Sequence, residues 1–108
     1  MALIQVESGN RDDIIGDNGK AYGCLQMHEA YVQDAAHHSG IPYAHEDAFN
    51  RDLAIDIFKI YMSIYANKYR LQREPTFEDI ARIHNGGPNG WQKDSTKPYW
   101  EKVKKYLD

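Results

Sequence analysis

The chain has 108 residues, of which 42% are hydrophobic and 27% are charged, and its net charge is −3 at pH 7. This composition is typical of an ordinary folded protein and excludes disordered and collagen-like chains. The length suits one hydrophobic core, so we expect a single domain over residues 1–108. Thirteen basic residues against sixteen acidic ones give no electrostatic basis for binding nucleic acid.

Cys24 is the single cysteine, so the chain cannot form an intrachain disulfide. The spacing of the histidines does not match a zinc site, and we expect neither a metal nor a cofactor. No apolar run reaches the roughly 20 residues that a membrane span needs, and the first residues lack the pattern of a secretion signal.

The first half of the chain predicts two helices separated by a hairpin. Residues 2–8 predict a short helix that ends at Gly9, because glycine accepts the left-handed conformation of a helix C-cap. From residue 10 to residue 22 the sequence is polar and Gly-rich, and Asp17-Asn18-Gly19 predicts the turn of a small hairpin or ordered loop. Residues 28–38 predict a second helix, closed by Gly40.

The strongest helical period runs from about residue 46 to residue 69 and predicts one long central core helix. Its apolar stripe consists of Phe49, Leu53, Ile57, Ile60, Tyr61, Ile64 and Tyr65. Thr76 and Asp79 resemble a capping box that opens a further helix, which should stop at Asn85 before the Gly-rich segment 85–90. A last helix is expected from about Pro98 to Tyr106.

Two carboxylates stand out as candidates for chemistry. Glu7 falls in the last turn of the first predicted helix, where the negative end of the helix dipole disfavours a further negative charge. Asp17 lies ten residues later in a loop that could bring it across a cleft from Glu7. Glycoside hydrolysis uses such a pair, one carboxyl protonated to donate to the leaving oxygen and the other ionised. The pair alone is a weak signal in a chain with sixteen acidic residues.

Three sequence blocks carry a resemblance to a known family. The first comprises Glu7-Ser8-Gly9-Asn10 and the segment from Gly16-Asp17-Asn18-Gly19 to Gln26-Met27, and it resembles lytic transglycosylases and goose-type lysozymes. The second, Ala81-Arg82-Ile83-His84-Asn85-Gly86-Gly87-Pro88, and the third, Tyr99-Trp100-Glu101-Lys102-Val103, are similar to invertebrate-type lysozymes, the destabilase family. In this order the blocks cover nearly the whole chain.

The resemblance implies a mainly α, lysozyme-like fold (α+β), in which a small hairpin or loop flanks the active-site cleft. It implies cleavage of the β-1,4 bond between N-acetylmuramic acid and N-acetylglucosamine in peptidoglycan, with Glu7 as the general acid and Asp17 as the second carboxylate. The expected substrate-contacting residues are Ser8, Tyr22, Gln26, His84, Asn85, Gly86 and Tyr99. The partner would be peptidoglycan or a related N-acetylglucosamine glycan, bound by a monomer that acts outside the cell or in the periplasm.

This chain departs from the family in one respect, since invertebrate-type lysozymes are rich in disulfides and this chain has one cysteine. A cysteine-poor form would suit a bacterial or phage member. Two alternatives remain open: a lytic transglycosylase that uses Glu7 alone, and a glycan-binding module without catalysis on the same fold. Ser8 with Lys20 and His84 would offer isopeptide cleavage, as is associated with destabilase-type relatives, but nothing in the sequence indicates that Lys20 is desolvated enough to act as a base.

Overall fold

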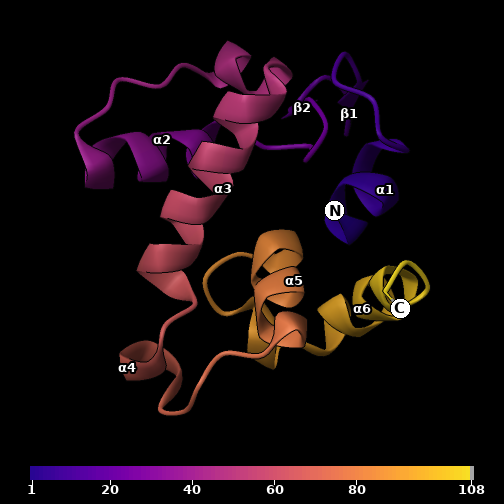
Figure 1. Cartoon of the computed structure of the whole chain (residues 1–108), viewed down its shortest axis with the longest axis vertical. Coiled ribbons are helices and arrows are strands. Elements are labelled where there is room, and N and C mark those ends of the chain that lie inside the picture. The colour runs from indigo at the N-terminus through magenta and orange to yellow at the C-terminus, as the bar shows by residue number, and fades with distance from the viewer. Residues whose placement is uncertain (108) are drawn as a thin grey trace. The chain divides into compact units, whose positions relative to one another are not determined.

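A computed structural model describes residues 1–107 as a mainly helical chain with one two-stranded antiparallel sheet, which confirms the predicted fold class. The chain forms two compact units, one built from Met1 and Leu3–Tyr61 and the other from Ala2 and the residues from Met62 onward. The single-domain expectation stays a prediction. In chain order the elements, drawn in Figure 1, are α1 (Ala2–Ser8), β1 (Ile15–Gly16), β2 (Ala21–Tyr22), α2 (Glu29–Ser39), the 3-10 helix η1 (His45–Phe49), α3 (Arg51–Tyr65), α4 (Lys68–Leu71), α5 (Phe77–Gly86), the 3-10 helices η2 (Gly90–Gln92) and η3 (Asp94–Thr96), and α6 (Lys97–Lys104).

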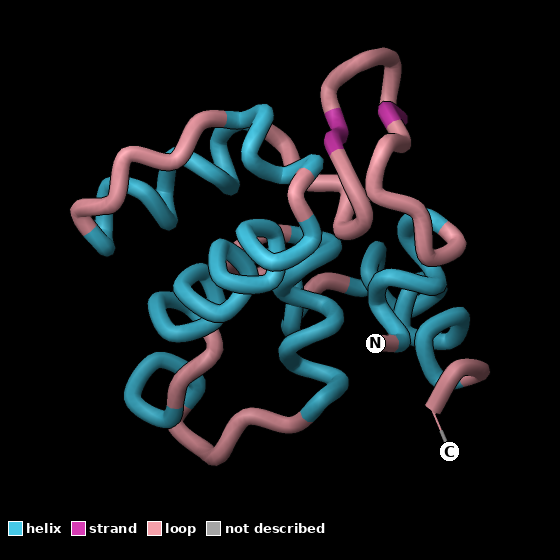
Figure 2. The backbone as a smooth tube through the Cα atoms, turned by 45° about the horizontal axis from the view of Figure 1, so that its top comes forward, coloured by secondary structure: helices cyan, strands magenta, loops and turns pink. Residues whose placement is uncertain are grey.

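The first unit opens with the predicted short helix and hairpin. Helix α1 ends where Gly9 adopts the left-handed conformation, with φ 64°. Strands β1 and β2 then pair with Ile15 opposite Tyr22, and the loop between them is visible in Figure 2. Asp17 and Asn18 both have positive φ, 51° and 55°, which aspartate and asparagine tolerate better than most residues. Both predictions are therefore confirmed.

Beyond the hairpin, the chain packs its backbone tightly against η1. Gly23 has φ 81°, and a Cβ placed there would lie 1.9 Å from the carbonyl oxygen of Ala48. Only glycine permits this approach. Helix α2 follows and ends at Gly40 in the left-handed conformation, as the sequence predicts.

The prediction of one helix from about residue 46 to residue 69 is wrong, because two asparagines interrupt the periodic segment. Asn50 has extended backbone (φ −92°, ψ 119°), and its Oδ1 accepts a hydrogen bond from the Leu53 N–H at 3.1 Å, which caps α3. Asn67 is also extended, and its Oδ1 accepts from the Arg70 N–H at 2.9 Å, which caps α4. Asparagine favours this N-cap role, so the segment becomes η1, α3 and α4.

The second unit contains the predicted capping box. The Asp79 N–H donates to Thr76 Oγ1 at 3.2 Å, and the Thr76 N–H donates to Asp79 Oδ2 at 2.8 Å, so each residue satisfies the other at the start of α5. The helix ends at Gly86, one residue beyond the predicted stop. Helix α6 has a proline in its first turn and lies within two residues of its predicted bounds.

Polar contacts join α5 to η2 and η3. The Arg82 Nε donates to the hydroxyl of Thr96 at 2.8 Å, and that hydroxyl donates to the carbonyl oxygen of Gly90 at 2.7 Å. A Cβ at Gly90 would lie 2.0 Å from the carbonyl oxygen of Arg82, so this backbone approach also requires glycine. Arg82 is buried, and its guanidinium also donates to Glu78 Oε2 at 2.7 Å and to the Lys93 carbonyl oxygen at 2.8 Å, which satisfies its remaining nitrogens.

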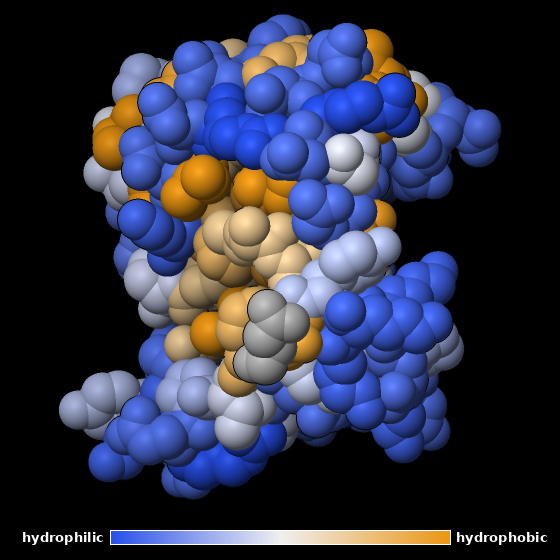
Figure 3. Space-filling view, turned by 45° about the vertical axis from the view of Figure 1, so that its right-hand side comes forward, coloured by the Kyte–Doolittle hydropathy of each residue, from blue (hydrophilic) through white to orange (hydrophobic). Residues whose placement is uncertain are grey.

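The surface carries hydrophobic as well as hydrophilic side chains, as the space-filling view shows (Figure 3). Several large hydrophobic side chains are exposed: Met1, Ile15, Ile41, Tyr69, Phe77, Tyr106 and Leu107. Within residues 1–107, none of the helices combines the length and the apolar character that crossing a membrane would demand.

Candidate functional site

Glu7 lies in the last turn of α1 and is half-buried. The helix buries Leu3, Ile4 and Ser8, which fixes the face on which Glu7 can project. Helix α1 then ends at the left-handed Gly9, so Glu7 is held by a short rigid element rather than by a loop.

Asp17 lies in the hairpin loop, and its carboxylate is within hydrogen-bond distance of His28. The Nε2 atom of His28 is 2.8 Å from Oδ2 of Asp17, and the two side chains are 50% and 56% exposed. His28 is the N-cap residue of α2, so the contact ties the hairpin loop to the start of that helix. The sequence did not predict this partner for Asp17.

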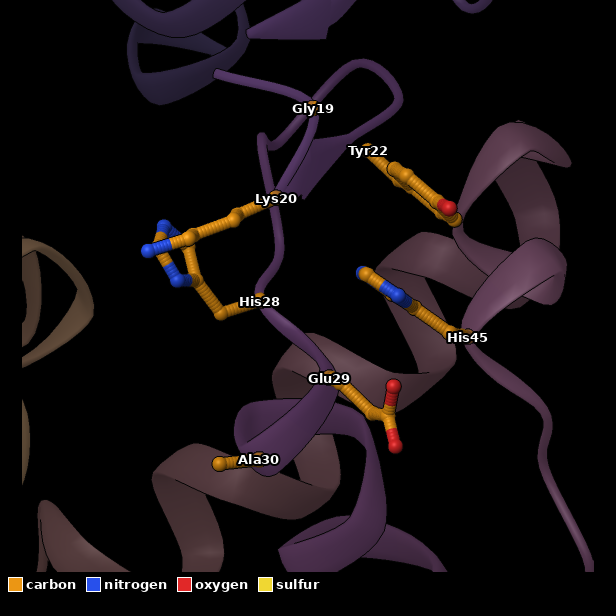
Figure 4. Close-up of a pocket in the computed structure, with 7 residues that line it drawn as sticks. All are labelled: Gly19, Lys20, Tyr22, His28, Glu29, Ala30 and His45. Carbon is orange, nitrogen blue, oxygen red and sulfur yellow. The ribbon is translucent and has the colours of Figure 1, made fainter. Parts of the chain in front are cut away.

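A pocket of about 330 Å³ lies between the hairpin and the start of α2. Its lining residues are Gly19, Lys20, Tyr22, His28, Glu29, Ala30 and His45. Figure 4 shows the rings of Tyr22 and His45 lying nearly parallel, and the side chains of Lys20 and His28 extending in the same direction. Tyr22, a predicted substrate contact, thus shares the pocket with the partner of Asp17.

The rings of the pocket are held in place by backbone bonds and stacking. The carbonyl oxygen of Met27 accepts from the Tyr22 N–H at 3.0 Å and from His45 Nε2 at 2.8 Å. Because a carbonyl oxygen only accepts, Nε2 of His45 carries a proton. The Tyr22 ring stacks on His45 with centroids 3.6 Å apart and on Phe49 with centroids 4.6 Å apart, so the aromatic wall is preorganised.

Arg51, at the start of α3, fixes the segment that connects the two candidate carboxylates. Its Nε donates to Oδ1 of Asp12 at 2.8 Å, and its other nitrogens donate to the side-chain oxygen of Asn10 at 2.6 Å and to the Asn10 carbonyl oxygen at 3.0 Å. Three bonds from one planar guanidinium determine the course of the chain between Glu7 and Asp17.

Two further residues predicted from the first block make structural hydrogen bonds. The buried Ser8 hydroxyl donates to the Ile4 carbonyl oxygen at 3.0 Å and accepts from the Arg11 N–H at 3.2 Å. The side-chain amide of Gln26 donates to the carbonyl oxygens of Gly23 and Ile14 at 2.9 and 3.2 Å. Both side chains thereby shape the loops around Glu7 and Asp17.

The predicted site residues of the second and third blocks belong to the second unit. His84 is buried near the end of α5, whereas Asn85 on the same helix is exposed. Gly86 ends this helix, and its carbonyl oxygen accepts from Lys93 Nζ at 2.8 Å. Tyr99 is 9% exposed in α6, so most of its ring packs in the core of this unit.

Residues 1–107 do not bring together three or more histidine, cysteine, aspartate or glutamate side chains in a way that could hold a metal ion. Cys24 is buried as a free thiol, and burial raises its pKa above the ordinary value. Neither feature adds a site to the one around the hairpin.

Sequence reasoning missed His28, His45 and Arg51. No local signal pointed to the first, because His28 directly precedes α2 while its partner Asp17 lies eleven residues earlier in the hairpin loop. The contacts of Arg51 join residues about 40 positions apart, which a local pattern cannot reveal.

Comparison with known proteins gives consistent matches. Residues 1–106 match the Destabilase family. The chain is 34% identical over 105 residues to a lysozyme of Magallana gigas, and this match covers 94% of this chain and 72% of that protein. It is 32% identical over 89 residues to a lysozyme of Ostrea edulis, which covers 81% of this chain and 62% of that protein. Over 45 residues, 42% of this chain and 32% of the relative, it is 47% identical to an invertebrate-type lysozyme of Ruditapes philippinarum.

The fold is also similar to a solved structure. A chain in the crystal structure of Aeromonas hydrophila PliI in complex with Meretrix lusoria lysozyme superposes with a TM-score of 0.79 at 31% sequence identity. The match covers 98% of this chain and 85% of that chain. The family match and the similarity to lysozymes span nearly the whole sequence, so the chain belongs to the Destabilase family together with the invertebrate-type lysozymes and is an enzyme of the lysozyme, glycoside hydrolase class.

Proposed function

We propose that this enzyme hydrolyses the β-1,4 bond between N-acetylmuramic acid and N-acetylglucosamine in peptidoglycan, with Glu7 as general acid and Asp17 as the second carboxylate. The observation that carries the proposal is that both carboxylates belong to one compact unit in different surroundings. Glu7 is half-buried at the end of a helix, whereas Asp17 is exposed in a loop and paired with an imidazole. Different surroundings are what lets two carboxyl groups take different protonation states.

In this mechanism Glu7 donates its proton to the glycosidic oxygen as the bond to the anomeric carbon breaks. Asp17 remains ionised and faces the positive charge that develops on the sugar ring. The His28 N–H donates to the Asp17 carboxylate at 2.8 Å and orients it. The oxygen of a water molecule bonds to the anomeric carbon, and a carboxylate of the pair takes the proton from that water, Glu7 in a retaining course and Asp17 in an inverting one.

The stereochemical course depends on how Asp17 acts. A nucleophilic Asp17, about 5 Å from Glu7, would form a covalent glycosyl intermediate and retain the anomeric configuration. An Asp17 that activates water across a gap of roughly 7–9 Å would invert it. Proton NMR of the first product anomer distinguishes the two courses.

The contacts proposed for the glycan differ in what they can offer. Tyr22 lines the pocket and, with its ring stacked on His45 and Phe49, can offer a sugar its edge. In the second unit, the exposed Asn85 has an amide available for sugar hydroxyls. Ser8 and Gln26 act by shaping the loops that carry the carboxylates, since their donors are engaged in structural hydrogen bonds. The roles of His84, Gly86 and Tyr99 in substrate contact remain predictions from the family resemblance.

Analysis of digestion products tests the proposed bond and mechanism. Mass spectrometry of soluble fragments from purified peptidoglycan should show fragments that end in reducing N-acetylmuramic acid. Fragments with a 1,6-anhydro end would instead indicate a lytic transglycosylase that uses Glu7 alone. Binding to the wall without any released fragment would indicate a glycan-binding module.

Variants at Asp17 separate the hydrolase from the transglycosylase in a second way. Asp17→Asn should lower the rate of glycan cleavage at least about tenfold, because an amide carries no charge to stabilise the transition state. Asp13→Asn is the matched control, since Asp13 is an exposed aspartate of the same connecting segment. Full activity of Asp17→Asn would refute the role of Asp17.

A further inference from the structure

His28 stands at the start of α2, but its side chain contacts the hairpin loop rather than the helix. It is the N-cap residue of α2, with extended backbone (φ −80°, ψ 161°), and its side chain makes no capping hydrogen bond to that helix. The imidazole instead reaches the hairpin loop, where Nε2 lies 2.8 Å from Oδ2 of Asp17. The contact joins two elements that are eleven residues apart in the chain.

The hairpin loop fixes its backbone but not the carboxylate of Asp17. The Gly19 and Lys20 N–H groups both donate to the Gly16 carbonyl oxygen at 3.1 Å, which closes the loop through the main chain. The Asp17 side chain is 56% exposed, and within the described chain His28 is the partner that holds it. An exposed aspartate samples several rotamers, and a catalytic carboxylate must occupy one of them.

The protons of the two pocket histidines can be assigned from their partners. A carboxylate oxygen accepts, so Nε2 of His28 donates to Asp17. Nε2 of His45 is engaged with the Met27 carbonyl oxygen, which leaves His28 as the pocket histidine whose N–H reaches the carboxylate. The other charged groups that line the pocket are Lys20 and Glu29, and the Glu29 carboxylate accepts from Gln33 at 2.9 Å.

We propose that His28 is the positioning residue of Asp17: it holds the carboxylate in one rotamer for the glycosidic reaction. The inference rests on the proposed role of Asp17. His28 also lines the pocket, so a sugar bound there would lie beside the imidazole that holds Asp17. Half-exposed ion pairs contribute little to folding, so the contact acts on catalysis rather than on stability.

A double-mutant cycle tests this inference with four proteins: wild type, His28→Ala, Asp17→Asn and the double variant. We expect His28→Ala to lower kcat on a soluble peptidoglycan glycan strand about three- to tenfold, with KM within about twofold. The melting temperature should stay within about 3 °C of wild type. In the Asp17→Asn background, the same change should lower kcat less than twofold.

Two more variants sharpen the result. His28→Asn keeps an N–H donor on a shorter side chain and should recover part of the lost kcat. His38→Ala, an exposed histidine on the same helix α2, should leave kcat unchanged. If Asp17→Asn falls below detection, the order wild type, His28→Asn, His28→Ala in kcat supports the inference.

Each opposing outcome has a distinct meaning. If His28→Ala keeps the wild-type kcat while Asp17→Asn loses activity, the role of His28 is overturned and the proposed function stays intact. Independent, multiplicative losses in the double variant, or a fall in melting temperature that accounts for the lost activity, also overturn it. Full activity of Asp17→Asn refutes the proposed function itself.

Discussion

Among the glycines of the first unit, Gly23 is the one whose replacement by alanine should destabilise the unit most. Gly23 has φ 81°, and the added Cβ would lie 1.9 Å from the Ala48 carbonyl oxygen and 2.7 Å from its carbon. The left-handed backbone costs a non-glycine residue about 1–2 kcal/mol. Relief of the clash by shifting backbone costs about 1–3 kcal/mol more. The free energy of unfolding should therefore fall by roughly 2–5 kcal/mol.

Thermal unfolding followed by circular dichroism measures this effect. For a domain of this size, each kcal/mol lowers the melting temperature by about 4–8 °C, so Gly23→Ala should melt at least about 10 °C below wild type. Gly40→Ala is the matched control, because Gly40 has φ 75° but nothing within 4 Å of the added Cβ, and from the backbone cost alone it should melt about 4–16 °C lower, less far than Gly23→Ala. Equal melting temperatures for the two variants would refute the predicted backbone clash.

Three further changes test the polar contacts. Arg51→Gln removes three hydrogen bonds to the segment after α1 and should lower the urea midpoint of unfolding, whereas an unchanged midpoint would contradict the described role. Burial opposes ionisation of Asp79, but hydrogen bonds from Arg73 and from Thr76 outweigh burial and hold the pKa of Asp79 below the ordinary value. The ionised carboxylate therefore stabilises the fold above about pH 4, and this stabilisation is lost as the pH falls through the lowered pKa. Asp79→Asn should thus flatten the acid limb of the stability profile, and a limb as steep as in wild type would argue against this assignment. Thr96→Val leaves the buried Arg82 Nε without its acceptor and should lower the free energy of unfolding by about 1–3 kcal/mol. An unchanged free energy of unfolding would mean that water replaces the hydroxyl as acceptor.

Local rules in the sequence predicted the elements whose ends are set by one residue. Gly9 and Gly40 end helices because they accept positive φ, and Thr76 with Asp79 forms the capping box because the two are three residues apart. The same kind of rule was overlooked at Asn50. The apolar period runs through Asn50 without a break, so periodicity alone does not reveal the N-cap that divides the segment.

The candidate site was predictable only in part, for a physical reason. The family-like blocks point to Glu7 and Asp17 as candidates, because the chemistry requires particular residue types at particular places. His28, which contacts Asp17, and Arg51, which holds Asn10 and Asp12, act through contacts between elements distant in sequence. Such contacts depend on how the chain folds back on itself, and no spacing rule encodes them.

The central claim is that Glu7 supplies the proton that breaks the glycosidic bond. The most direct measurement compares Glu7→Gln with wild type in the rate at which purified cell wall loses turbidity, with Glu46→Gln, an exposed glutamate of η1, as the control. We predict that Glu7→Gln loses at least about 100-fold in rate and still sediments with the wall, because an amide cannot donate the proton although the fold and the binding surface persist. Clearing of the wall by Glu7→Gln at the wild-type rate would contradict the claim.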